Sequence, residues 1–457
     1  MNWAFFLLRF AIAGGVLCLF FLSQLFWHRA IWRATANFRR QWLRVAVRLV
    51  WLGVVALVVS AFVDGVRMGH RHMIPRGTMV SALVGLWFFS ALFAFLAVKF
   101  VRGLDFLWSR IRKNNRPRPP EPVPPSQLVL SPATPASVEQ LQDPSRRYFF
   151  RAVTAAAGAA PFLGAMYGYA AERLNYQIRR VEIPISGLNP ALNGMSIVQL
   201  SDIHMSGYMP RSQVRRAVEM ANELGADLAV VTGDFITSAS DPLAECIDEI
   251  RQLHAPLGIW GCNGNHEIYA RVERAAQTLF AQARMTLLRQ ENTQLTFKGA
   301  QFNLIGVDYQ RERTSEGQKR QTLINAEELV RRDMPNILLS HNPNSFPRAA
   351  ELGIELSLAG HTHGGQIQVE ILDHRLSPAR FITDYVAGLY QRPLFASSLD
   401  MPATRAQGYS EAPRVSHGKS AANGLASIYV NRGLGTVGAP VRIGVPPEIT
   451  LIVLRRS

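Results

Sequence analysis

The sequences GNHE at Gly264–Glu267 and GHTHGGQ at Gly360–Gln366 decide the fold of this 457-residue chain. Three further polar clusters accompany them: SDIH at Ser201–His204, GDF at Gly233–Phe235 and SHNP at Ser340–Pro343. Each cluster follows an apolar run of the kind that forms a buried strand. Together they supply Asp, Asn and several His side chains, which are the ligands expected of a two-metal hydrolytic site.

Each cluster is a weak signal by itself. An Asp-x-His sequence occurs by chance, Asp234 could cap a helix, and Asn265 could simply adopt a left-handed turn conformation. The pair His361 and His363 is a moderate metal signal. The joint case is strong, because five of the eleven histidines lie in these clusters: His204, His266, His341, His361 and His363.

From Val181 onward, short apolar or β-branched runs alternate with segments of helical periodicity. The first strand-like runs are Val181–Ile185, Ser196–Leu200, Leu228–Val231, Gly258–Trp260, Phe302–Val307, Ile337–Leu339 and Ile354–Leu358. The closing ones are Gln366–Ile371, Ala426–Val430 and Ile449–Leu454. The helical segments are Arg211–Leu224, Leu243–Leu253, Val272–Arg284 and Ala326–Arg332. This alternation predicts a largely parallel sheet covered by helices, with the ligand site at the carboxyl ends of its strands. Arg375–Lys419 is not strand-like and is interpreted as a long surface insertion.

The order D-x-H, GD, GNHE, H, GHTH resembles that of the calcineurin-like metallophosphoesterase superfamily, from about Val181 to the C-terminus. The endings NRGLGT at Asn431–Thr436 and PPEITL at Pro446–Leu451 are similar to those of its bacterial membrane-associated branch. The resemblance implies a four-layer α/β sandwich that binds two divalent metal ions, of which Mn, Fe or Zn suit carboxylate, amide and imidazole ligands.

The resemblance also implies a role for each matching residue. Three are implied for one ion: Asp202, His204 and His363. Three are implied for the other ion: Asn265, His341 and His361. Asp234 would bridge the two ions, and His266 would stand near the leaving-group oxygen as general acid or charge stabiliser.

Elementary chemistry supports this set. Two cations about 3.5–4 Å apart can hold a bridging hydroxide, lower its pKa and clamp the oxygens of a phosphoryl group. The carboxylate of Asp234 can reach both ions, whereas a neutral imidazole cannot. One position departs from the family pattern: Thr237 stands where many members carry a second Asp, so one hydrogen bond behind the ligands could be missing.

Three apolar runs near the N-terminus are long enough to be membrane spans: Trp3–Trp27, Leu49–Val63 with its extension Leu43–Val47, and Gly77–Val101. The first 151 residues hold 20 Lys and Arg against 5 Asp and Glu, a net charge of +15 of the total +16. Because these charges flank apolar runs, they indicate membrane topology and disfavour nucleic-acid binding.

A Pro-rich linker over 116–144 follows the three spans. The sequence SRRYFFR at Ser145–Arg151 and the uncharged run Ala152–Ala170 then resemble a twin-arginine export signal. The pair Arg146 and Arg147 could equally be an ordinary cytoplasmic flank. No A-x-A cleavage site follows, so this run is expected to stay as a fourth span.

Basic residues predict that the loop His28–Gln41 and the segment Arg102–Arg151 are cytoplasmic. The intervening loop Asp64–Arg76 then lies outside, as does everything after Ala170. The predicted organisation is an all-α transmembrane region over 1–115, the linker, a signal and fourth span over 145–175, and a metallophosphoesterase domain over 176–457. The expected location is the inner membrane of a bacterium, with the domain on the periplasmic or extracellular side.

The leading hypothesis is a membrane-anchored, metal-dependent phosphoesterase. It would hydrolyse a phosphate monoester or diester that is lipid-linked or associated with the cell envelope. Hydrolases of a lipid A precursor occur in the wider superfamily, but that substrate is cytoplasmic and conflicts with the predicted topology. A catalytically silent metal-binding receptor or scaffold is the alternative, because fold alone does not determine function.

The two thiols after the spans, Cys246 and Cys262, are interpreted as buried apolar groups, with a bridge between them left open.

Overall fold

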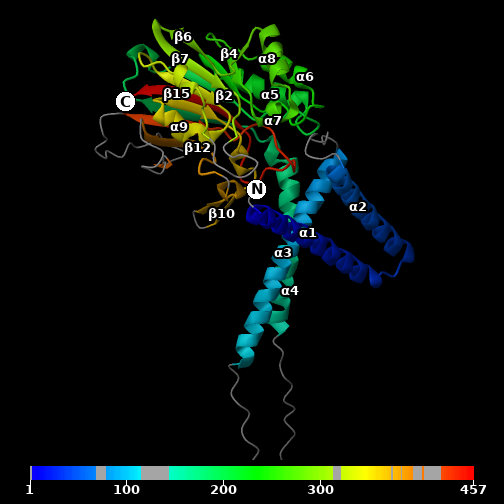
Figure 1. The fold of residues 1–457 in the computed structure, drawn as a ribbon. Helices are drawn as coiled ribbons and strands as arrows, with labels where there is room; N and C mark the ends of the chain where they lie inside the picture. Colours follow the sequence, from blue (N-terminus) through cyan, green and yellow to red (C-terminus); the bar gives the residue numbers. More distant parts are fainter. Residues whose placement is uncertain are drawn as a thin grey trace, which may run out of the picture. The chain divides into compact units, whose positions relative to one another are not determined.

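The computed structural model describes residues 3–67, 79–114, 144–311, 321–371, 374–381, 383–394, 404–405 and 424–457 (Figure 1). The Pro-rich linker lies outside these residues except for Pro144, and so do parts of the Asp64–Arg76 loop and of the Arg375–Lys419 insertion. The chain divides into two compact units. A helical unit comprises 7–55 and 87–164, and the other unit contains 165–457 with 1–6 and 56–86.

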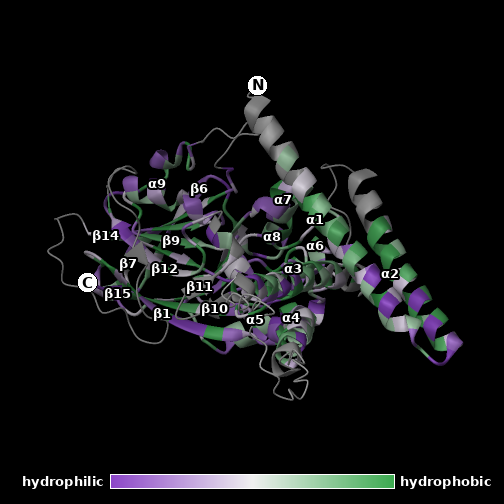
Figure 2. Cartoon of the chain, turned by 90° about the horizontal axis from the view of Figure 1, so that it is seen from below, coloured by the Kyte–Doolittle hydropathy of each residue, from purple (hydrophilic) through white to green (hydrophobic). Residues whose placement is uncertain are grey.

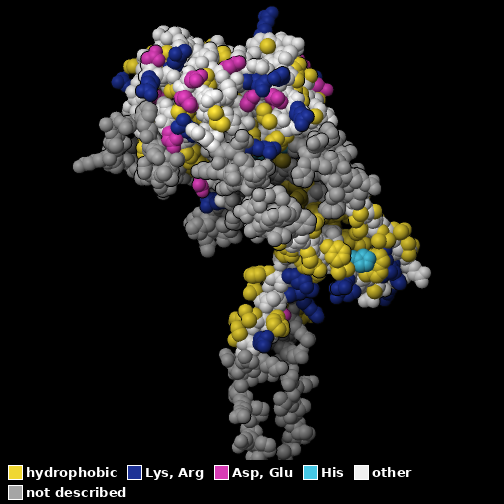
Figure 3. Space-filling view, viewed as in Figure 1, with side chains coloured by type: hydrophobic (Ala, Val, Ile, Leu, Met, Phe, Trp, Pro, Cys, Tyr) yellow, Lys and Arg dark blue, Asp and Glu magenta, His cyan; other side chains and the backbone are white. Residues whose placement is uncertain are grey.

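Four long helices precede the α/β domain: α1 (Trp3–Ala36), α2 (Gln41–Arg67), α3 (Met79–Asn114) and α4 (Pro144–Ala170). Each contains a stretch that is long and apolar enough to cross a membrane: Gly14–Ala36, Gln41–Ser60, Val84–Ile111 and Tyr148–Leu174. Hydrophobic residues predominate along α1 and α2, and hydrophobic side chains cover much of the visible helix surface (Figures 2 and 3). The prediction of a loop over His28–Gln41 is wrong for most of its length, because α1 continues to Ala36.

Contacts inside the helical unit establish the relative directions of its helices. In α2, Arg48 Nε donates to Thr35 Oγ1 at 3.1 Å and Trp51 Nε1 to His28 Nδ1 at 3.1 Å, so α2 is antiparallel to α1. Trp87 of α3 donates to Gln24 Oε1 of α1 at 3.1 Å, and Trp27 of α1 donates to Ala91 O of α3 at 2.9 Å. These two hydrogen bonds make α3 parallel to α1. The pairs Trp87–Phe162 and Val98–Gly158 make α4 antiparallel to α3.

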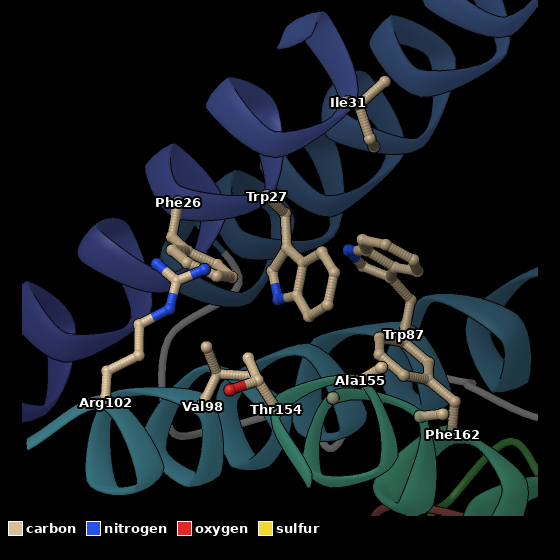
Figure 4. A pocket seen from close by; sticks show the side chains of 11 residues that line it. Phe26, Trp27, Ile31, Trp87, Val98, Arg102, Thr154, Ala155 and Phe162 are labelled. Carbon is tan, nitrogen blue, oxygen red and sulfur yellow. The ribbon is translucent and has the colours of Figure 1, made fainter. Parts of the chain in front are cut away.

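An apolar pocket of about 530 Å³ lies between α1, α3 and α4 of this unit (Figure 4). The rings of Trp27, Trp87 and Phe162 line it, and Arg102 extends along the ring of Phe26 at its edge. Because both indole N–H groups are hydrogen-bonded within the bundle, the tryptophans present only apolar ring surface to the pocket.

The α/β domain is built on two mixed sheets. The six-stranded sheet has the order β1 (Gln177–Ile185), β15 (Glu448–Arg456), β2 (Ser196–Leu200), β3 (Leu228–Thr232), β4 (Ile259–Cys262), β5 (Thr286–Leu287). The seven-stranded sheet has the order β13 (Thr404–Arg405), β12 (Gly388–Pro393), β14 (Leu425–Val430), β9 (Leu356–Ala359), β8 (Asn336–Ser340), β7 (Ala300–Val307), β6 (Glu291–Phe297). A two-stranded ribbon joins β10 (Val369–Ile371) to β11 (His374–Leu376). Strands β2 to β5 are parallel, as are β14, β9, β8 and β7. The predicted parallel arrangement therefore holds for the centre of each sheet.

Two kinds of apolar core hold four layers together (Figure 1). Alternate strand residues, such as Ile197 and Leu339, face each other in the core between the two sheets. On the other face of the first sheet, residues such as Val231 pack with the helices α5 (Arg211–Asn222), α6 (Leu243–Ile250) and α8 (Glu273–Gln282). On the other face of the second sheet, the core includes α9 (Phe346–Glu351). This is the expected α/β sandwich.

Two expectations about the elements are wrong. The predicted helix Ala326–Arg332 is only a single 3₁₀ turn over Ala326–Glu328. The segment Arg375–Lys419 is not simply a surface insertion, because it contains β12, whose residues alternate between buried and half-buried positions. Strand β15 runs antiparallel to β2, because the chain returns to the first sheet after completing the second.

Candidate metal centre

All five polar clusters lie at the end of a strand. Ser201 follows β2, Gly233 follows β3 and Asn263 follows β4 in the first sheet. His341 follows β8 and Gly360 follows β9 in the second sheet. Because these strands are parallel within each sheet, their carboxyl ends bring the five loops to one edge of the sandwich.

The predicted ligands form three overlapping groups of side chains. Within each group, the atoms that could bind a metal ion lie within 4.8 Å of one another. The groups are Asp202 with His204 and His363, His204 with Asp234 and His266, and Asp234 with His341 and His361. Asn265 joins the third group, since its Oδ1 lies 2.7 Å from His361 Nδ1. The structure therefore brings together every residue that the sequence predicted, with Asp234 shared between two groups.

Five of these residues have left-handed backbone conformations, which non-glycine residues seldom adopt. Their φ angles are 48° at Asp202, 49° at His204, 55° at Asp234, 74° at His361 and 52° at His363. Each costs on the order of 1–3 kcal/mol, although Asp tolerates the conformation better than most residues. Such a concentration of unfavourable backbone conformations is typical of a functional site, because the surrounding structure must hold it in place.

Hydrogen bonds orient three imidazole rings from behind. Thr232 O lies 2.6 Å from His341 Nδ1, Thr237 Oγ1 lies 3.2 Å from His204 Nδ1, and Thr237 O lies 2.7 Å from His266 Nδ1. In each ring the other nitrogen, Nε2, is therefore left for the centre of the site. The hydrogen bond that was expected to be missing at Thr237 is present, because its hydroxyl contacts the candidate ligand His204.

Burial keeps three of the five imidazoles in the clusters neutral at neutral pH. It lowers the pKa of His204 to about 3 and the pKa of His361 to about 4, with a further contribution from the charge of a neighbouring histidine in each case. Burial also lowers the pKa of His363 well below its usual range. A neutral imidazole keeps the lone pair that a metal ion requires, so no proton has to leave these rings on binding.

His341 differs from the other rings. Burial opposes its charge, but the carboxylates of Asp234 and Asp202 outweigh that effect and raise the pKa of His341 to about 10. Its Nε2 lies 3.0 Å from Asp234 Oδ2 and 3.9 Å from Asp202 Oδ1. A proton on this ring therefore balances part of the buried negative charge, and a cation between the same groups would take its place.

The donor set fits two divalent cations. His204 Nε2 and His363 Nε2 are 3.2 Å apart, and both lie near a carboxylate, at 3.5 Å from Asp234 and 3.3 Å from Asp202. Two neutral imidazole nitrogens at this distance need a proton or a cation between them. Imidazole, carboxylate and amide donors without thiolate suit Mn, Fe or Zn. We therefore infer from the donors themselves that these residues could hold metal ions.

Glu267 is a site residue that the sequence analysis did not assign. Its carboxylate is fully buried and accepts hydrogen bonds from the backbone N–H groups of Gly264, Asp234 and Phe235 at 2.8–2.9 Å. Burial, and secondly the charge of Asp234, raise its pKa to about 7. Glu267 thus ties the loop after β4 to the loop after β3. The GNHE sequence contained this signal, but only the fold reveals which backbone groups need an acceptor.

The C-terminal sequence NRGLGT supports the Asp202 loop from the other side. Leu434 N donates to Ser201 O at 3.0 Å and Gly435 N donates to Asp202 O at 2.7 Å. The guanidinium of Arg442 is fully buried beneath this sequence. Its hydrogen bonds go to carbonyl oxygens, those of Arg432, Gly433, Gly435 and Val445. A single buried cation therefore organises the backbone that carries Asp202.

The last turn of α4 packs directly on the same segment. Arg442 N approaches Gly168 O at 3.4 Å, and a Cβ on Gly168 would lie 2.5 Å from Arg442 O. Just beyond the helix end, Arg173 donates to Tyr169 O and, at 2.8 Å, to Tyr208 O. The end of the fourth helix is thus part of the α/β domain.

Comparison with known proteins agrees with this geometry. Residues 195–365, which include the sequences GNHE and GHTHGG, match the family described as calcineurin-like phosphoesterase. The chain contains a calcineurin-like phosphoesterase domain. The matched residues run from the start of β2 to the GHTHGG loop, so all the predicted ligands and His266 lie within the matched part of this phosphoesterase domain.

Three relatives of the phosphoesterase domain show how widely it occurs. A bovine transmembrane protein with metallophosphoesterase domain is 30% identical over 293 residues, 61% of this chain and 57% of that protein. The uncharacterised metallophosphoesterase YkuE of Bacillus subtilis is 29% identical over 327 residues, 68% and 98% of the two chains. The UDP-2,3-diacylglucosamine pyrophosphatase LpxG of Chlamydia trachomatis is 26% identical over 306 residues, 57% and 84%. The chain spans about three fifths of the length of the bovine and zebrafish relatives that it matches.

Proposed function

We propose that the chain is a membrane-anchored phosphoesterase that uses two divalent metal ions to hydrolyse a phosphate monoester or diester. The observation that carries this proposal is the buried carboxylate of Asp234, which belongs to two groups of candidate ligands at once. A shared carboxylate between two sets of imidazoles is what a pair of neighbouring cations requires. The phosphoesterase family of residues 195–365 supports the same reaction class.

The proposed roles follow the three groups. One ion is held by Asp202, His204 and His363, and the other by Asn265, His341 and His361. When bound, the two ions supply positive charge that offsets the negative phosphoester and favours attack by water. The chain contributes a rigid set of ligands, because hydrogen bonds from Thr232 and Thr237 orient their rings.

His266 is proposed to donate a proton to the leaving-group oxygen. Its Nδ1 is hydrogen-bonded to Thr237 O, so its Nε2 is the atom that faces Asp234 and His204. Its backbone N–H also donates to Asp234 Oδ1 at 2.9 Å. When the ring also carries a proton on Nε2, as the imidazolium, this hydrogen bond aims that second proton at one position, which is the requirement for general acid catalysis.

The substrate class is proposed from the helices that precede the phosphoesterase domain. Four apolar helices would keep the site near a bilayer, which favours a lipid-linked or envelope phosphoester over a soluble metabolite. The likeness to LpxG, whose name describes hydrolysis of a diacylated sugar nucleotide, supports the same class.

The test of this function uses the purified full-length chain. Asp234→Asn should remove metal from both positions and abolish hydrolysis of bis-p-nitrophenyl phosphate and p-nitrophenyl phosphate. Asp333→Asn, an exposed position, is the matched control and should retain wild-type metal content and activity. Full activity of Asp234→Asn would rule out the shared carboxylate. A wild-type chain that binds two metal ions but hydrolyses no ester would favour the silent receptor or scaffold.

We also propose that the phosphoesterase domain faces the outer side of a bacterial inner membrane. Support comes from the helix directions, since α2 is antiparallel to α1, α3 is parallel to it and α4 is antiparallel to α3. Four alternating spans leave the end of α4 on the side where α1 begins. The proposed organisation keeps the predicted boundaries: spans over 1–115, a linker over 116–144, an uncleaved twin-arginine-like signal over 145–175 and the domain over 176–457.

Replacement of Arg146 and Arg147 by Lys tests the twin-arginine signal. Because twin-arginine export depends on the arginine pair, the variant should leave the phosphoesterase domain inside, where externally added protease cannot digest it. Replacement of Arg110 and Arg112 by Lys preserves charge in the same way and should not change protease access. Equal digestion of the wild type and the Arg146 and Arg147 variant would reject the signal.

A further inference from the structure

A continuous row of rings extends from the candidate metal centre to an exposed cation. The ring of Tyr309 lies 5.3 Å from that of His361 and 6.2 Å from that of Tyr269. Tyr269 lies in turn 6.2 Å from His266, and the guanidinium of Arg311 stacks on Tyr269 at 4.7 Å. The row therefore starts at the ligands, passes the proposed proton donor and ends at a positive charge.

The backbone that carries Tyr309 and Arg311 is held firmly beside the site. Asp308 accepts hydrogen bonds from Asn263 Nδ2 at 2.8 Å and from Arg289 Nε at 2.9 Å. Two residues later, Gln310 O accepts a hydrogen bond from Asn342 Nδ2 at 3.0 Å. These contacts connect the loop after β7 to the loops after β4 and β8. Tyr309 lies between two braced residues and so has a defined position against His361.

The charges in this row are distributed unevenly. Asp308 is already neutralised by Arg289, with Arg289 Nη2 2.8 Å from Asp308 Oδ2. Arg311 is exposed, and among the described residues its contact is the face of Tyr269 rather than a carboxylate. Tyr269 is 37% exposed despite its position next to His266. An aromatic face that supports a guanidinium leaves the N–H edge of that guanidinium available to an anion.

We infer that Tyr269, Tyr309 and Arg311 form a recognition site for a leaving group that itself carries negative charge, such as a second phosphate. This inference rests on the proposed function, since it takes His266 as the residue on the leaving-group side. Arg311 then binds the second anion through paired hydrogen bonds, while the two rings lie between it and the candidate metal centre. The site selects organic pyrophosphates over esters with an uncharged leaving group.

A binding experiment tests this inference without requiring turnover. The dissociation constants of methylenebisphosphonate, which carries two adjacent anionic groups, and of methylphosphonate, which carries one, are measured by calorimetry on the full-length chain in Mn²⁺ buffer. Arg311→Gln should weaken bisphosphonate binding about 10- to 100-fold, the usual range for a charge-assisted hydrogen bond, and should weaken methylphosphonate binding much less. Arg311→Lys should give an intermediate loss, because Lys keeps the charge but not the planar pair of donors.

Matched variants separate the site from general electrostatics and from folding. Arg274→Gln removes an exposed positive charge on α8 and should leave both dissociation constants unchanged. Tyr269→Phe should retain the preference for bisphosphonate, whereas Tyr269→Ser, which removes the ring under Arg311, should reduce it. If Arg311→Gln leaves the ratio of the two dissociation constants unchanged, whether both ligands bind more weakly or neither does, the inference is overturned.

The two proposals fail in different ways. If the wild type hydrolyses p-nitrophenyl esters but Arg311→Gln leaves the ratio of dissociation constants unchanged, the recognition site is wrong and the phosphoesterase stands. If the wild type hydrolyses no ester yet prefers bisphosphonate through Arg311, Arg311 binds a second anion, but the enzymatic function is wrong and so is the assignment of that anion to a leaving group.

Discussion

Glycines in α1, α2 and α3 and glycines around the candidate metal centre occupy opposite environments. Gly14, Gly15, Gly53, Gly85 and Gly103 lie in the helices, and a Cβ built on any of them meets no atom within 4 Å. Around the site a Cβ would overlap a neighbouring group at every one of these positions: Gly233, Gly264, Gly360, Gly433 and Gly435. The same residue type is therefore dispensable in one region and required in the other.

The difference shows that close backbone approach is needed at the candidate metal centre and not in the helices. At the candidate metal centre two loops approach each other so closely that no side chain fits between them. A Cβ on Gly360 would overlap Ser201 Oγ and the carboxylate of Asp202, and one on Gly264 would lie 2.6 Å from Asp234 N. In the helices, exposed apolar side chains such as Val50 and Phe100, at 70% and 68%, suit a lipid environment that imposes far looser packing.

Gly360→Ala should have the largest effect. The added methyl group would push the His361 loop away from Asp202, whose carboxylate accepts the His361 N–H at 2.9 Å. We expect a loss of bound metal and at least about a 100-fold loss of phosphoesterase activity, since ligand geometry tolerates little displacement. Metal analysis and ester hydrolysis measure this. Gly103→Ala is the control in a helix, and an equal effect of both substitutions would remove the contrast between the regions.

Glu267→Gln should have the next largest effect. An amide cannot accept all the backbone N–H groups that the carboxylate accepts, and its own N–H₂ would face donors. We expect a loss of about 1–3 kcal/mol in the free energy of unfolding and about a 10- to 100-fold loss of metal affinity. Chemical denaturation and metal titration measure these quantities. Wild-type values for both would mean that the loop after β3 holds Asp234 without this support.

Thr237→Val should have a smaller effect, confined to one ligand. The substitution keeps the shape of the side chain but removes the hydroxyl that contacts His204 Nδ1 at 3.2 Å. We expect about a 10-fold loss of metal affinity, at the low end for a group that orients a ligand. Thr237→Ser retains the hydroxyl and should bind metal as the wild type does. If Ser and Val behave alike in titrations, the hydrogen bond is unimportant.

Gly53→Ala should have almost no effect, or a small favourable one. Alanine is favoured over glycine inside a helix by about 0.5–1 kcal/mol, and no neighbour obstructs a methyl group on Gly53. We expect unchanged hydrolysis and an unchanged or slightly raised melting temperature in detergent. A marked loss of stability would indicate that α2 packs against another surface at this position.

The sequence was sufficient to predict the elements that repeat a simple pattern. Strands β2, β3 and β8 agree closely with their apolar runs, because a strand buried on both faces is continuously apolar. Strand β12 escaped prediction, since polar residues such as Gln391 and Arg392 interrupt it and its pairing with β14 comes from distant sequence. The helix expected at Ala326–Arg332 is only one 3₁₀ turn, although Ala326 packs with strand residues such as Ile305 and Leu338 of the second sheet.

The residues of the candidate site likewise divide into those that local sequence reveals and those that only the fold reveals. The seven candidate ligands and His266 are recognisable because metal chemistry demands particular side chains next to glycines. Glu267, Arg442 and the hydroxyl of Thr237 act on backbone groups or on rings from distant loops, so their roles depend on which segments meet. The left-handed conformations of Asp202 and His361 are likewise a property of the folded loops, not of local sequence preference.

The contact between Gly168 and Arg442 has a practical consequence for any soluble form of the protein. A fragment that starts after Ala170 would lose the helix turn against which the Arg442 segment rests, although it would retain every ligand. A fragment that starts at Ala165 would keep that turn but would carry the exposed side chains of Met166 and Tyr167 into water. The best boundary therefore retains the turn and replaces Met166 and Tyr167 with polar residues.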